Sequence, residues 1–128
     1  MGNPAAKKGD FIIATDMHLI QPPGSAPPVM TPHPYNGQID GGLCGSVLIM
    51  GVPAATVDST ASNSPAHQPI GGSFVSPPSN ASKIITGSAT VSIGGKAAAR
   101  NGDTANTCNH PGDLPVGTVM AGGSVLIG

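Results

Sequence analysis

The sequence predicts a small all-β domain built from three similar units of short strands and turns. Glycine and proline supply 19 + 14 = 33 of the 128 residues and interrupt nearly every window long enough for a helix. Only 9% of the residues are charged and the net charge is −1, which argues against a disordered chain of the same composition. A strand motif and a turn motif also recur along the chain, as expected of repeat architectures.

The strand motif occurs three times. Gly45–Ile49 reads Gly-Ser-Val-Leu-Ile, and Gly123–Ile127 repeats it letter for letter. Both are continuous apolar runs, which favours strands buried on both faces. The third copy, Gly87–Ile93, alternates small or apolar residues with Ser and Thr, the pattern of a half-buried strand.

The turn motif follows the pattern [Pro/Ala]-Ala-Ala-x-x-(Gly)-Asp. Its copies are Pro4–Asp10, Val52–Asp58 and Lys96–Asp103, with spacings of 58 − 10 = 48 and 103 − 58 = 45 residues between the Asp residues. A short helical turn is expected only around Pro4–Lys8. Two segments outside the repeat, the Pro-rich Gln21–Pro34 and the Pro/Ser/Asn-rich Ser76–Ser82, are expected to be surface loops.

Charge and hydropathy exclude several classes of protein. Five basic residues cannot form the dense cationic face that nucleic acid requires. No apolar run is long enough for a transmembrane helix, and Phe11–Ala14 is too short for a signal peptide, so we expect the protein to start in the cytoplasm. Two cysteines are too few for a disulfide scaffold.

Metal-binding side chains follow the three repeats at similar distances. His18 lies eight residues after Asp10, and His67 lies nine after Asp58. Cys108 and His110 lie five and seven residues after Asp103 and compete for one position. Three units around a pseudo-threefold axis would bring these donors together.

His33, in the Pro-rich segment, offers a fourth donor. Three imidazoles and one thiolate suit a closed tetrahedral zinc site, although iron or another first-row metal is compatible with the same donors. Such an ion would replace a core that narrow loops cannot build. Taken singly, each His is more often a surface or hydrogen-bonded residue than a metal ligand, and the case for a metal rests on how the donors follow the repeats. Cys44 is interpreted as a small buried hydrophobic residue.

With these residues in view, the chain resembles the PAAR family, named for Pro-Ala-Ala-Arg repeats. The resemblance covers essentially the whole chain, and individual motifs are weaker evidence than their order. The matching segments are Thr31–Gly37, Val52–Asp58, Gly87–Asp103, Thr107–Asn109 and Val116–Gly128. No copy spells the tetrapeptide in full.

The resemblance implies a single conical domain over residues 1–128, without an effector extension. It would sit as a monomer on the blunt end of a trimeric, β-helical, VgrG-like spike of a type VI secretion system, an extracellular injection particle or a phage tail. A structural zinc near the apex is a family feature. Carried over residue by residue, its ligands are His18, His33, His67 and Cys108. His110 departs from the pattern of similar sequences.

The leading functional hypothesis is therefore mechanical. The protein would be assembled in the cytoplasm, sharpen the spike, help it pierce a target envelope and be delivered outside the cell or into the target on firing. The expected spike-facing strands are Ser46–Met50, Ala89–Ile93 and Ser124–Ile127. Stable membrane insertion and enzymatic activity are not expected. Effector binding through the loop Gln21–Pro32 is a further hypothesis.

Two alternatives belong to other classes. A small zinc hydrolase would need an open coordination position and a general base, for which Asp16 or Asp113 qualifies. The chain's size and glycine content argue against an obvious substrate pocket. A metal-free structural β-repeat protein would show a shorter and more regular period.

Overall fold

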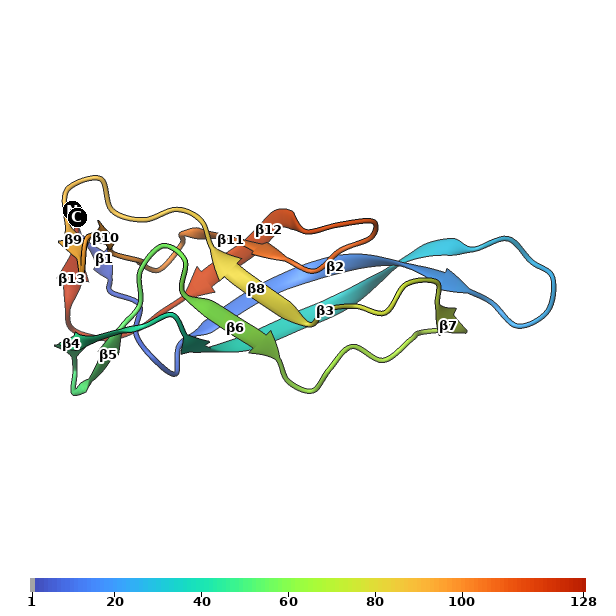
Figure 1. Cartoon of the computed structure of the whole chain (residues 1–128), viewed down its shortest axis with the longest axis horizontal. Coiled ribbons are helices and arrows are strands. Elements are labelled where there is room, and N and C mark those ends of the chain that lie inside the picture. The colour runs from blue at the N-terminus through green and yellow to red at the C-terminus, as the bar shows by residue number, and fades with distance from the viewer. Residues whose placement is uncertain (1) are drawn as a thin grey trace.

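The computed structural model describes residues 2–128, and these residues form strands, turns and loops without a helix. The predicted all-β fold is confirmed. The molecule is elongated, with short strand pairs gathered at one end and a long hairpin extending to the other (Figure 1). Within the described residues, no helix has the length and hydropathy needed to cross a membrane.

Three short antiparallel strand pairs form the wide end of the molecule, called the base here (Figure 1). The pairs are β1 (Asn3–Pro4) with β13 (Leu126–Ile127), β4 (Cys44–Ile49) with β5 (Val52–Ala54), and β9 (Ser92–Ile93) with β10 (Lys96–Ala97). Each contains one predicted strand motif paired with the start of one predicted turn motif.

The three units are joined by two rings of backbone hydrogen bonds. In the inner ring, Ala6 N–H donates to Ala99 O (2.9 Å), Ala99 N–H to Ala55 O (3.1 Å), and Ala55 N–H to Ala6 O (3.0 Å). An outer ring runs from Lys8 to Pro53, from Val57 to Ala97 and from Asn101 to Pro4. The three inner alanines are fully buried, so only a small side chain fits where the units converge. The predicted pseudo-threefold arrangement is therefore present at the base.

The structure corrects the alignment of the second unit. Asp10 and Asp103 accept from the backbone N–H three residues earlier, and Ser59, not Asp58, does so in the second unit. Asp58 has φ +78° and matches Gly9 (+94°) and Gly102 (+91°). The repeat is therefore conserved in backbone conformation, and its Asp is replaced by Ser in one copy.

Two other predictions about the base are wrong. Pro4–Lys8 forms no helical turn, because its backbone groups are used in the strand pair and in the rings. The two apolar strand motifs are not buried on both faces: Leu48 is 61% and Leu126 60% exposed. Their buried faces are provided by Ile49 and Ile127, which pack with Ile93 of the third unit.

Above the base, six strands close into a small barrel. Their order is β12 (Leu114–Met120), β11 (Thr104–Thr107), β8 (Ala81–Ile84), β6 (Thr60–Asn63), β3 (Val29–Gly41) and β2 (Phe11–Gln21), and β12 pairs with β2 to close the barrel. β7 (Ser73–Phe74) pairs with the far end of β2.

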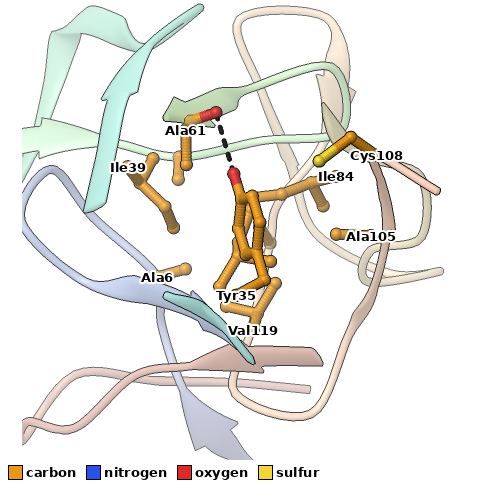
Figure 2. Close-up of a cluster of buried hydrophobic side chains, with 11 residues drawn as sticks. Ala6, Tyr35, Ile39, Ala61, Ile84, Ala105, Cys108 and Val119 are labelled. Carbon is orange, nitrogen blue, oxygen red and sulfur yellow. Dashed lines mark hydrogen bonds between the residues drawn. The ribbon is translucent and has the colours of Figure 1, made fainter. Parts of the chain in front are cut away.

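The barrel core surrounds Tyr35, the only tyrosine of the chain (Figure 2). Its hydroxyl donates to Ser82 Oγ (2.7 Å) and lies 3.1 Å from Ala61 O. A Cβ at Gly37 would lie 2.6 Å from that hydroxyl, so the glycine makes room for the ring. Cys108 lies at the edge of this core (Figure 2), and its thiol contacts Asp16, one of the polar residues described below.

The β2–β3 hairpin extends beyond the barrel and forms the narrow end (Figure 1). The predicted loop Gln21–Pro34 is therefore too long, because β3 already begins at Val29. Pro32 and Pro34 are tolerated because β3 pairs with β6 only from Gly37 onward, which leaves that edge unpaired here. The exposed remainder of the loop lies at the tip.

Candidate metal centre

Strand alternation directs two donors from β2 into the molecule. Ile12, Asp16, His18 and Ile20 lie on the buried face of this strand. On β3, His33, Tyr35 and Ile39 face inward in the same way. Asp16 and His33 are direct cross-strand partners.

A clamp on β2 places Cys108. Just after β11, Asn109 Oδ1 accepts from Met17 N–H (2.6 Å), and His110 N–H donates to Met17 O (2.8 Å). The turn is thereby fixed against β2 beyond the point where β12 stops pairing with it. His110 contributes through its backbone and is outside the group of donors that converge. Of the two competing residues, the structure brings Cys108 to the site.

His67 is positioned by two asparagines. Its N–H donates to Asn80 Oδ1 (2.8 Å), and Asn80 adopts the left-handed conformation. Asn63 Oδ1 accepts from Asn36 N–H, which turns Asn63 Nδ2 toward His67 Nδ1 (3.2 Å). Since Nδ1 then accepts, the ring proton lies on Nε2, which donates to Asp16 Oδ2 (2.8 Å).

One buried group of potential ligands results. Donor atoms of Asp16, His18, His67 and Cys108 all lie within 4.8 Å of one another, and all four residues are buried. His33 is adjacent, with its ring centroid 5.6 Å from those of both His18 and His67. Phe74 of β7 contacts the His18 and His33 rings with centroid distances of 5.6 and 5.4 Å.

The donor set fits a metal ion. Among the described residues, His18 Nε2 and His33 Nε2 are buried side-chain atoms without a hydrogen-bond partner. His33 Nδ1 lies 2.8 Å from Thr31 O and must donate to it, so Nε2 carries a free lone pair. Buried polar atoms normally have partners, and a cation is the partner that suits two bare imidazole nitrogens beside a thiol.

Burial controls the protonation of the donors. Burial, reinforced by neighbouring His67, lowers the pKa of His18, which favours the neutral imidazole that binds metals. Burial and the carboxylate of Asp16 raise the pKa of Cys108 to about 11. A bound cation would oppose both effects on the thiol and favour the thiolate.

The structure thus places all four predicted ligands close together, while the ligand set itself stays a prediction. Asp16 was expected only as a general base for a hydrolase; Asp113, the other candidate base, is exposed and outside the cluster. The signal for Asp16 was its position two residues before His18 in a strand. Cys44 is partly buried, and its thiol lies 3.3 Å from Ser46 Oγ, away from the cluster.

A hollow of about 360 Å³ lies beside the cluster, against His33 and His67, contrary to the expectation of no obvious pocket. Its other walls include Pro34, Pro65 and Ile70.

The tapering β-fold with a threefold base and a buried donor cluster defines a class of small β-cones with a candidate structural metal centre. The sequence profile described as the PAAR motif matches residues 30–109, which is 80 of the 128 residues. The chain therefore belongs to the PAAR-motif family, whose members are structural proteins at the tips of spikes. No curated protein matches the sequence.

Proposed function

We propose that this protein is the tip of a trimeric, VgrG-like spike in a contractile injection machine, where it is held in shape by one structural zinc ion. It is assembled on the spike in the cytoplasm and leaves the cell with the spike on firing. The observation that carries this proposal is the base, whose three equivalent strand pairs match a platform of threefold symmetry.

The base also offers an apolar surface for docking. Leu48 and Leu126 occupy equivalent positions in two units and are among the most exposed hydrophobic residues described; Met50 and Val125 lie beside them in sequence and are also exposed. Ser92 takes the equivalent position in the third unit. Apolar contacts, supplemented by the backbone edges of the short strands, suit binding to the last β-layer of a spike.

Binding to a purified trimeric VgrG-like spike, measured by native mass spectrometry, tests the docking proposal. We expect one chain per trimer. Leu48→Asp and Leu126→Asp should each weaken binding by about tenfold or more, since each puts a charge into an apolar interface. Val29→Asp is the matched control, because Val29 is 53% exposed on the hairpin at the other end. Base variants that bind like wild type would contradict the proposal.

Zinc would be held by His18, His33, His67 and Cys108, with Asp16 beside them, and His67 would bind through Nε2 after losing the proton that it now donates to Asp16. The ion would join β2, β3, the loop before β7 and the turn after β11, and its role would be to stiffen the narrow part of the cone. Elemental mass spectrometry of protein purified without a metal-binding tag should find about one zinc per chain. Folded protein without metal would refute this part, and chelator-sensitive hydrolysis would favour the enzyme alternative.

A further inference from the structure

Asp16 is a fully buried carboxylate without a Lys or Arg partner. The five Lys and Arg residues lie elsewhere, and among the described ion pairs three of them pair with Asp10, Asp58 and Asp103. The contact of Asp16 with His67 is a hydrogen bond from a neutral ring, since Nδ1 of that ring accepts from Asn63. Burying a carboxylate without a cation is costly, so this position requires a positive charge nearby.

The hydrogen bonds of Asp16 show that it acts as an acceptor on both oxygens. Oδ1 accepts from Thr107 Oγ1 and lies 3.4 Å from Asn109 Nδ2. Oδ2 accepts from His67 Nε2 and, at 3.4 Å, from the thiol of Cys108. This carboxylate therefore contacts both the turn that carries Cys108 and the loop that carries His67. His18 lies two residues after Asp16 on the same strand, β2.

The charges of the site do not balance without Asp16. A divalent ion held by three neutral imidazoles and one thiolate leaves a net charge of +1 in a buried place. Asp16 reduces that charge to zero. A monovalent ion such as Cu⁺, which thiolate and imidazole ligands also bind, would be neutral with the thiolate alone.

We propose that Asp16 is the counter-charge of the metal centre and makes it selective for a divalent over a monovalent ion. The inference rests on the metal centre proposed above. Asp16 acts as a specificity-determining residue whether its Oδ2 contacts the ion or remains beside it, because the Coulomb interaction requires only proximity in a buried site.

The test is the ratio of two affinities, measured by chelator competition with Zn²⁺ and, under anaerobic reducing conditions, with Cu⁺. The Coulomb energy between Asp16 and the ion is proportional to the charge of the ion, whereas the repulsion between Asp16 and the Cys108 thiolate is the same for both ions and cancels in the ratio. We expect Asp16→Asn to weaken Zn²⁺ binding by about tenfold more than it weakens Cu⁺ binding. The Zn²⁺ to Cu⁺ preference then falls about tenfold.

Thr107→Val is the matched control. It removes a hydrogen bond to Oδ1 in the same buried place but keeps the charge of Asp16. It should weaken the binding of both ions by a similar factor and leave their ratio unchanged.

If Asp16→Asn does not fold, Asn63→Asp tests the effect of a counter-charge by adding a negative charge beside the centre instead of removing one. It places a carboxylate on the other side of the His67 ring and should raise the preference for Zn²⁺. Equal losses for both ions in Asp16→Asn, or an unchanged ratio in Asn63→Asp, would overturn the counter-charge role. Wild-type protein that takes up no zinc would overturn the metal centre itself and this inference with it.

Discussion

The base and the narrow part of this molecule are stabilised in different ways. The base is built by repetition: three units exchange backbone hydrogen bonds in closed rings around three buried alanines. The narrow part has no such symmetry, and its buried space is filled by one carboxylate, three imidazoles and a thiol from separate segments. Backbone hydrogen bonds join the repeated units of the base, whereas the narrow part depends on interactions among its buried polar side chains.

The largest expected effect comes from removing the metal. At free zinc 1,000 times above its Kd, binding stabilises the folded state by about 4 kcal/mol, which is on the order of 15 °C in Tm for a domain of this size. Calorimetry with and without chelator measures the difference. Cys108→Ser, which removes the thiolate, should make the protein insensitive to the chelator, while Cys44→Ser serves as the control. A chelator-insensitive wild type would show that the narrow part is stable without an ion.

The next effect concerns Tyr35, whose pKa burial raises to about 12. The ordinary pKa of tyrosine is about 10, so the folded state favours the protonated phenol. The resulting stability of about 3 kcal/mol is fully present below pH 10 and is lost as the pH rises through 12.

Denaturant unfolding across this range measures the effect, since the difference between wild type and Tyr35→Phe isolates it from other groups. Tyr35→Phe should be less stable at neutral pH, by about 1–2 kcal/mol for the lost hydrogen bonds, but should become the more stable of the two at high pH, where wild type has lost about 3 kcal/mol. The chain has one Tyr and no Trp, so tyrosinate absorbance follows the same titration directly. Parallel pH profiles for the two proteins would rule out this account.

Overpacking the base tests its symmetry. Ala99→Val adds two methyl groups where the ring leaves no space and should cost about 1–3 kcal/mol. Ala6→Val and Ala55→Val should cost similar amounts, because the three positions are equivalent. Ala66→Val, at an exposed position, is the control. Urea unfolding measures the free energy of unfolding of all four variants. If one of the three ring positions tolerated valine, the three positions would not be equivalent.

The smallest effect is expected for Asp10→Ser. Ser59 already performs the same turn-capping role in the second unit, so the change copies a solution present in the molecule. The partly buried ion pair with Lys7 is also lost, which costs on the order of 1 kcal/mol. A loss of several kcal/mol, by the same unfolding measurement, would mean that the units are not interchangeable at this position.

The sequence was sufficient to predict the repeated part of the fold. The strand motifs at 45–49 and 123–127 and the three turn motifs are local patterns, and they lie in the three strand pairs as expected. Their exposure was predicted wrongly because a continuous apolar run looks the same in a core and on a docking face. The sequence did not reveal that Ser59, and not Asp58, caps the turn of the second unit, because the positive φ of Asp58 cannot be read from the residue type.

The long strands of the hairpin were missed for a reason connected with the site. In β2, Asp16 and His18 occupy inward positions where a strand normally places apolar residues, which destroys the period-2 signal. His33 does the same in β3, and two prolines add to the effect. Functional residues are where sequence patterns are expected to fail. Spacing from the repeats indicated His18, His67 and either Cys108 or His110, and the family resemblance completed the predicted set with His33 and Cys108. The place of Asp16 depended on contacts distant in sequence.

Hydrogen exchange of individual amides, with and without chelator, tests the difference between the two regions most directly. The amides of Ala6, Ala55 and Ala99 should remain protected after metal removal, because the rings do not involve the donor cluster. The amides of His67 and His110, which fix the loop and the turn that carry proposed ligands, should lose protection by at least about tenfold. Uniform loss across both regions, or no change at His67 and His110, would contradict this account.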